Sequence, residues 1–135
     1  MKKVDFAKLK VGDLVEVPRT QFSMTRRGWN GWLFSHAVVL DKGISKKTGR
    51  QVVKVEMMYP SNYPSNGNDY RTAVKVFVAD AVFQTNALNT AKRLLKENHG
   101  DAQNREEFEK SIVENEVVGC DWMRFLADKG FLFKG

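Results

Sequence analysis

The sequence is poor in the residues that most catalytic and metal sites require. It contains one cysteine and two histidines in 135 residues, and no two of these three have the spacing of a zinc site. It also lacks a glycine-rich phosphate-binding loop. We therefore predict no catalytic residue, no metal site and no cofactor.

The two histidines and the cysteine are also weak candidates one by one. His36 lies among apolar neighbours in an expected strand and His99 stands at an expected helix end, so neither has a nucleophile at a linked spacing. Cys120 precedes an expected helix, where the helix dipole favours a thiolate. Because no base can be assigned to it, we interpret Cys120 as a capping or packing residue. An enzyme using Cys120 or His36 is the alternative.

Long apolar runs and a second cysteine are missing as well. No stretch approaches the roughly 20 apolar residues that a membrane span requires, and the charged residues 1–5 are not followed by an apolar run of signal-peptide length. The single cysteine cannot form an internal disulfide, which excludes a disulfide-stapled secreted scaffold. These absences predict a cytoplasmic protein with no membrane partner.

Acidic residues are scarce in the first part of the chain. The net charge is +6, and residues 1–80 carry 14 Lys and Arg against 7 Asp and Glu, whereas residues 81–135 carry 8 against 9. A positive excess concentrated in one region favours an anionic partner such as nucleic acid. In the alternative, the positive charge only keeps the protein soluble.

The clearest pattern that is present is an antiparallel hairpin over residues 32–58. Two alternating apolar runs flank a lysine-rich turn at residues 41–50, which contains Gly43 and Gly49. We expect an earlier strand at residues 14–17 that Pro18 ends, a long polar loop at 19–31, and a fourth strand at about 72–78. Both faces of the strand from Trp32 onward are largely apolar, so that strand should be central.

From about residue 85 the apolar spacing becomes helical. We expect helices from residue 85 or 86 to 99, from 104 to 116 with Asp101 or Asn104 as the cap, and from 121 to 129. Residues 131–134 should pack as an edge strand or as a tail. The fold class is therefore α+β. The length suits a single domain over residues 1–135, with a β part (1–84) and a helical part (85–135) packed on it.

Residues 11–17 read Val-Gly-Asp-Leu-Val-Glu-Val and are followed by Trp32 and then Ala-Val-Val-Leu at 37–40. Over residues 11–58 this pattern resembles the opening of small SH3-like barrels of the Tudor and Agenet type. The resemblance implies an N-terminal SH3-like antiparallel barrel or bent sheet, with the two or three helices as an addition that the minimal barrel lacks. It also implies a module that binds peptides or nucleic acids and performs no chemistry.

A candidate binding surface follows from strand direction. If consecutive strands are antiparallel, the first and third connections leave the sheet at the same end. Aromatic faces stack on unpaired bases and arginines neutralise phosphates, and the same groups can form a cation-binding cage. The residues concerned are Arg19, Arg26, Arg27, Trp29, Tyr59, Tyr63, Tyr70 and Arg71. In the alternative, Trp29 and the tyrosines turn inward to close the barrel, and the arginines are only solvated.

A second basic group belongs to the hairpin turn at the opposite end of the sheet. It comprises Lys46, Lys47 and Arg50, with Lys42 nearby. These residues would follow a phosphate backbone, or they would simply be a solvated turn that discourages edge aggregation.

Three functions are compatible with these patterns. The first is a non-enzymatic nucleic-acid-binding module that binds DNA or RNA. The second is an inhibitor or adaptor of the kind found in phages and mobile elements, such as an anti-CRISPR or anti-restriction protein, which binds a nucleic-acid-processing enzyme. The third is a peptide-binding Tudor-like module.

Overall fold

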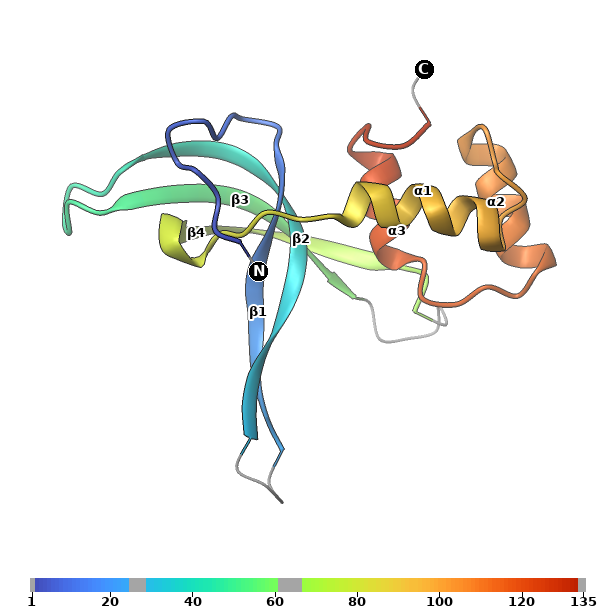
Figure 1. Ribbon diagram of the computed structural model, residues 1–135, viewed down its shortest axis with the longest axis horizontal. Coiled ribbons are helices and arrows are strands. Elements are labelled where there is room, and N and C mark those ends of the chain that lie inside the picture. The colour runs from blue at the N-terminus through green and yellow to red at the C-terminus, as the bar shows by residue number, and fades with distance from the viewer. Residues whose placement is uncertain (1, 25–28, 61–66, 134–135) are drawn as a thin grey trace. The chain divides into compact units, whose positions relative to one another are not determined.

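The chain folds into four strands followed by three helices (Figure 1). The computed structural model describes residues 2–24, 29–60 and 67–133, with the side chains of residues 21–32 outside the description. The elements are β1 (Leu14–Met24), β2 (Trp29–Ile44), β3 (Gln51–Pro60), β4 (Tyr70–Val78), the 3-10 turn η1 (Ala79–Ala81), α1 (Ala87–Asn98), α2 (Arg105–Glu114) and α3 (Asp121–Asp128). The predicted α+β class is confirmed.

These elements belong to two compact units. The sheet unit comprises Met1–Tyr59 and Thr72–Thr85, and the helical unit comprises Pro60–Arg71 and Asn86–Gly135. The sheet unit carries 13 Lys and Arg against 6 Asp and Glu, and the helical unit carries 9 against 10. The positive excess of the chain therefore lies wholly in the sheet unit.

The sheet is open and its strands follow chain order, β1-β2-β3-β4. β2 pairs antiparallel with β3 from Ala37 opposite Met57 to Ile44 opposite Gln51, which confirms both the predicted hairpin and the central place of β2. Alternate side chains of each strand face one core, because successive residues of a strand point to opposite faces. The core residues are Leu9, Val15, Val17, Ala37, Val39, Val53, Val55, Met57 and Val82.

The long polar loop expected at residues 19–31 was wrong over most of its length. β1 continues to Met24 and pairs with β2 as far as Trp29, so the two strands extend as a ribbon beyond the rest of the sheet (Figure 1). Pro18 does not end the strand because the register shifts between Pro18 and Thr20. Arg19 is the extra residue of this bulge, which absorbs the proline without breaking the ladder.

The segment after η1 lies along the other edge of β1. Glu16 and Phe83 exchange two backbone hydrogen bonds of 2.9 Å each, and Val4 N donates to Val82 O at 3.1 Å. Beside this contact, the rings of Phe34 and Phe83 meet edge to face with centroids 5.5 Å apart. Backbone pairing therefore reaches from the start of the chain to the end of the sheet unit.

The helical unit is built as its apolar spacing predicts. Ala87, Ala91 and Leu95 are the buried face of α1, and Phe108 and Ile112 are buried on α2. Of the two caps considered for α2, the structure selects Asn104, whose side chain accepts a 2.9 Å hydrogen bond from Glu107 N.

The end of the chain forms no strand in its described part. Residues 131–133 are a bend that begins where Phe131 N donates to Leu126 O at 2.9 Å. Leu132 is buried, and the ring of Phe133 lies 5.5 Å from that of Phe108. Of the two expectations for residues 131–133, the packed tail is confirmed and the edge strand was wrong.

Candidate nucleic-acid interface

The basic turn, which we define as residues 45–50 between β2 and β3, presents three exposed cations on a hydrogen-bonded backbone. Ser45 N donates to Arg50 O and Gly49 N donates to Ser45 O, both at 2.8 Å. Gly49 has a φ of +71°, which explains a glycine at this position. Lys46, Lys47 and Arg50 are all exposed. Hydrogen bonds of the backbone and of the Ser45 and Thr48 hydroxyls therefore shape the turn.

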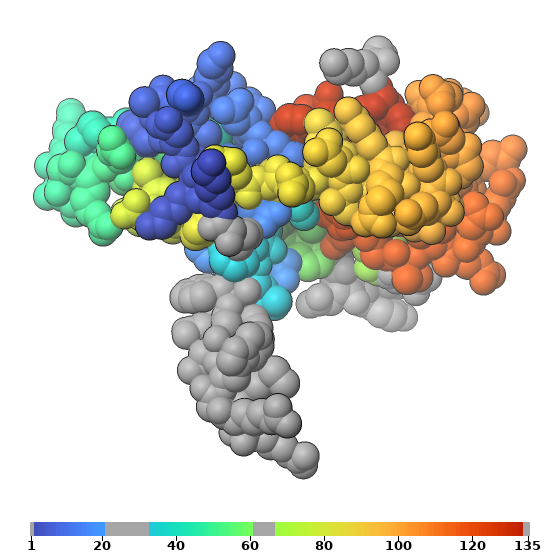
Figure 2. All heavy atoms as spheres, in the orientation of Figure 1, coloured from blue at the N-terminus to red at the C-terminus, as the bar shows by residue number. Residues whose placement is uncertain are grey.

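Figure 2 shows this turn at one end of the sheet unit, where the colour passes from turquoise to green. Next to it, a shallow groove of about 220 Å³ is lined by Asp41, Lys42, Gly43, Ile44, Val52, Lys54 and Val76. Ile44 is 58% exposed and Val76 is 61% exposed. The turn and the groove together combine positive charge with open apolar surface.

Lys42 differs from its neighbours in this region. Its Nζ donates to Phe6 O at 2.6 Å and to Ala7 O at 3.3 Å, and it lies 4.9 Å from the centroid of the Phe6 ring. The ammonium group therefore ties the N-terminal segment to β2. Among the lysines near the turn, Lys46, Lys47 and Lys54 are the exposed ones.

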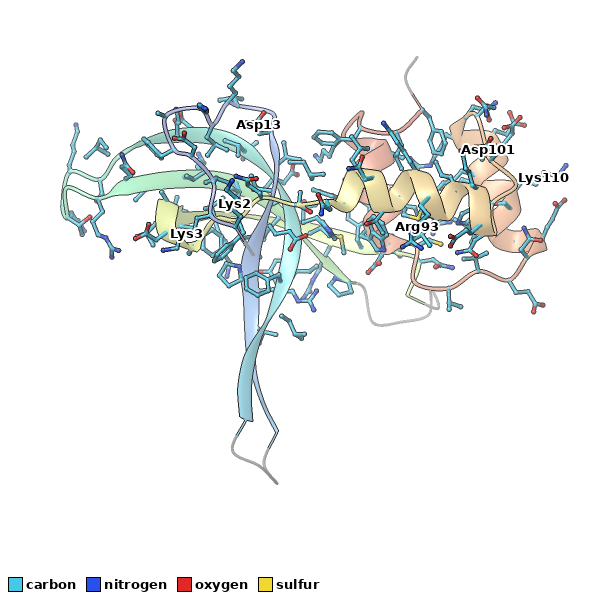
Figure 3. The ribbon with its side chains drawn as sticks, viewed as in Figure 1. Lys2, Lys3, Asp13, Arg93, Asp101 and Lys110 are labelled. Carbon is cyan, nitrogen blue, oxygen red and sulfur yellow. The ribbon has the colours of Figure 1, made fainter. Side chains whose placement is uncertain are left out.

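A second, smaller hollow includes Arg50 in its lining. It is lined by Arg50, Gln51, Val78, Ala79 and Asp80, and Asp80 is also 3.8 Å from Lys3 Nζ, a side chain labelled in Figure 3. Arg50, the last residue of the basic turn, thus shares this hollow with the carboxylate of Asp80.

The predicted surface at the other end of the sheet is only partly described. Arg26, Arg27 and Tyr63 lie outside the described residues, and Trp29 is described only through its backbone, which pairs with Met24. Arg19 is half-buried at the bulge of β1.

The two tyrosines of this predicted set that are described belong to different units. Tyr59 is half-buried against the sheet core, and its hydroxyl lies 3.6 Å from Met57 Sδ. Tyr70 belongs to the helical unit, as does the exposed Arg71. The Tyr70 hydroxyl donates to Asp128, and its ring meets that of Phe125 at 5.4 Å, edge to face. Both rings therefore have structural contacts within their own units.

Tyr70 is one end of a polar network that joins the helices. Arg105 Nε donates to Glu109 Oε1 at 2.9 Å, and Arg105 Nη1 donates to Asp128 Oδ1 at 2.5 Å. Arg124 donates from Nε to Glu109 Oε1 at 3.1 Å and from Nη1 to Asn68 O at 2.6 Å. Although burial by itself favours the protonated acids, these hydrogen bonds lower the pKa of Glu109 and of Asp128.

The helical unit also contains a buried chain of polar side chains that the sequence analysis did not find. Ser111 Oγ donates to Phe108 O at 2.8 Å, so it accepts the hydrogen bond from His99 Nδ1. Burial lowers the pKa of His99, so the imidazole is neutral at pH 7 and its other ring nitrogen has no proton. Cys120 Sγ lies 3.9 Å from that nitrogen, and the neutral imidazole therefore faces a thiol. Because 21 residues separate His99 from Cys120 in sequence, no spacing motif reveals the pair.

This arrangement suits packing better than covalent catalysis. Cys120 is 2% exposed and His99 is 4% exposed, and burial raises the pKa of the Cys120 thiol and lowers that of His99. The amide protons at the start of α3 are engaged: Cys120 N donates to Asn68 Oδ1 at 2.9 Å and Asp121 N to Gly67 O at 3.2 Å. Acyl transfer would need such donors for a developing oxyanion.

Among the described residues, no group of three or more His, Cys, Asp or Glu side chains is arranged to hold a metal ion. No helix in the same residues is long and apolar enough to cross a membrane.

Comparisons of the chain with models of protein families, with curated proteins and with solved structures found no match.

Proposed function

We propose that this protein is a non-enzymatic nucleic-acid-binding module whose sheet unit contacts the phosphate backbone through the basic turn. The observation that carries the proposal is the gathering of all the excess positive charge in one compact unit, with Lys46, Lys47 and Arg50 exposed together on a turn shaped by its backbone. Clustered exposed cations on one face are the electrostatic footprint of nucleic-acid binding. A cytoplasmic location, where such ligands are accessible, is part of the proposal.

The proposed architecture behind this function is a small SH3-like barrel of the Tudor or Agenet type. Its support is the η1 turn after β4 and the pairing of Phe83 with Glu16 on the free edge of β1. A last short segment that returns to the first strand is what would protect an otherwise open sheet edge.

The test is the salt dependence of binding, compared between two charge-matched variants. The double variant Lys46→Gln, Lys47→Gln removes two charges from the basic turn, and Lys92→Gln, Lys96→Gln removes two exposed charges from α1. Each lost phosphate contact should reduce the slope of log K against log salt by about 0.7 to 0.9. The turn variant should therefore bind a 20-nucleotide probe more weakly and with a shallower slope.

The α1 variant should bind like the wild type, because its charges lie in the unit without a positive excess. An equal loss of affinity in both variants would mean that binding depends on the net charge of the protein rather than on the basic turn. Affinity that does not change between about 50 and 200 mM salt would contradict the proposal as a whole.

A second candidate is an inhibitor or adaptor that docks the same surface on a nucleic-acid-processing protein. The observation that favours it is the exposed apolar surface beside the turn, where Ile44, Val74 and Val76 are 58%, 56% and 61% exposed, because apolar patches rimmed by polar groups mark protein interfaces. A stable protein complex in a pull-down, without intrinsic oligonucleotide binding, would select this candidate.

A further inference from the structure

The groove beside the basic turn contains side chains that a phosphate backbone alone would not bind. Its lining combines the apolar side chains Ile44, Val52 and Val76 with Lys54 and Asp41. The exposed ends of Ile44 and Val76 offer apolar contact area, and burial of such area is favourable only against another apolar surface. Phosphate oxygens and sugar hydroxyls do not provide one.

The carboxylate in the groove limits the ligand further. Asp41 is exposed, and its Oδ1 accepts a 2.8 Å hydrogen bond from Lys42 N. A carboxylate repels phosphate but accepts hydrogen bonds from the amino groups on base edges, as Asp and Glu do from cytosine N4. Asp41 therefore gives the groove an acceptor for the edge of a base, next to the ammonium group of Lys54 on the opposite strand.

An intact duplex meets these conditions only in part. Base edges such as cytosine N4 are accessible in its major groove, but its flat, apolar base faces are stacked inside and cannot enter a shallow site. A single strand exposes both the apolar face and the polar edge of each base. The register of the hairpin places the groove next to the turn cations, because Asp41 is opposite Lys54 and Ile44 is opposite Gln51, the residue after the turn.

We infer that the groove holds an unpaired base while Lys46, Lys47 and Arg50 hold the neighbouring phosphates, so that the ligand of the sheet unit is single-stranded nucleic acid. This inference rests on the proposed function and specifies its substrate class. It names the groove residues Ile44, Val76 and Asp41 as contacts to the base, separate from the cations that contact the backbone.

The test measures fluorescence anisotropy of the full chain with four probes at about 50 mM salt: one 20-nucleotide sequence as single-stranded DNA, single-stranded RNA, blunt DNA duplex and blunt RNA duplex. At least one single strand should bind about tenfold more tightly than its duplex. Val76→Ser should lower the affinity for the single strand about tenfold, since removing an apolar contact of this size changes a dissociation constant by about that factor. It should leave the affinity for the duplex and the slope of log K against log salt unchanged.

Two control variants separate the groove from other causes. Val113→Ser changes a valine on α2 that is 76% exposed and should have no effect on either probe. The double variant Lys46→Gln, Lys47→Gln should bind the single-stranded and the duplex probe more weakly by the same factor, because both probes carry phosphates. Circular dichroism spectra and melting curves that match the wild type establish that each variant is folded.

Several outcomes would overturn the inference, and they can be told apart. Duplex binding equal to or tighter than single-strand binding, or an unchanged Val76→Ser variant, refutes the base-holding groove and leaves the proposed function standing. No binding of any oligonucleotide refutes both. An acidic peptide such as poly-glutamate that binds in a Val76-dependent manner, while oligonucleotides do not, would assign the groove to a protein partner and refute both as well.

Discussion

At the scale of single residues, the clearest result is how burial determines the states of His99 and Cys120. Neither side chain carries charge in this environment, because the desolvation of a charged imidazole or thiolate is not offset by an opposite charge. Ser111 gives the imidazole one defined tautomer, and the thiol completes the chain. A cysteine and a histidine at hydrogen-bonding distance thus form a neutral packing contact.

The stability of the helical unit should fall as the pH drops below about 6.5. Burial lowers the pKa of His99 in the folded state, so protons bind the unfolded state more readily. The stabilising contribution is therefore present above the unfolded-state pKa of about 6.5 and is lost as pH falls through the lower folded-state pKa. Urea unfolding between pH 7.5 and pH 5 measures the effect.

Two variants isolate the contribution of His99. His99→Gln should remove most of the pH dependence in this range, although it also lowers stability at neutral pH. His36→Gln should retain the pH dependence of the helical unit, because His36 lies in the sheet unit, 3.7 Å from Glu16. An unchanged pH dependence in His99→Gln would show that another group is responsible.

At the scale of elements, single residues connect the helices. Glu109 accepts hydrogen bonds from Arg105 on its own helix and from Arg124 on α3. Asp128 of α3 accepts a further hydrogen bond from Arg105. Spacing along one helix predicts the pair of Arg105 with Glu109, four residues apart. The contacts of both side chains to α3 come from packing.

Glu109→Gln should lower the free energy of unfolding by about 1 kcal/mol, a modest value because solvent partly screens this site. The matched control is Lys110→Gln on the same helix, whose side chain is 72% exposed and whose Nζ lies 3.7 Å from Glu114 Oε1; Lys110 points away from α2 in Figure 3. The control should change stability by less than about 0.5 kcal/mol. Chemical denaturation of both variants gives the comparison, and equal effects would mean that the bridge to α3 contributes nothing.

The strands show how a single residue changes an element's length. Pro18 was expected to end β1, since proline has no amide proton for a ladder. The bulge at Arg19 instead carries the strand past the proline. Beyond the bulge, the sequence from Thr20 to Met24 has little alternation, so a periodicity argument has no signal there.

At the scale of the whole molecule, each of the two units has its own core. Val39, Val55 and Met57 are fully buried in the sheet unit, and Phe108 and Phe125 are fully buried in the helical unit. The charge is divided in the same way, with the positive excess on the sheet unit.

We expect a core substitution to act first on its own unit. Phe108→Leu should destabilise the helical unit by about 1 to 3 kcal/mol through the space it leaves. Native-state hydrogen exchange should then show reduced protection in α1, α2 and α3, while the amides of β2 and β3 keep theirs. The reciprocal variant Val55→Ala should affect β2 and β3 and spare the helices. An equal loss of protection throughout the chain after either substitution would show that the units unfold together.

The sequence by itself determined the α+β class, the hairpin around residues 41–50, the three helices and the location of the positive charge, because these follow from local periodicity, helix caps and composition. Tertiary structure alone decided how far β1 continues past Pro18, which lysines near the turn remain exposed, and that His99 meets Cys120. Lys42 shows the reason: its backbone carbonyl partners on Phe6 and Ala7 are 36 and 35 residues away. Contacts at such separations depend on how the strands and helices pack, and no spacing along the chain encodes them.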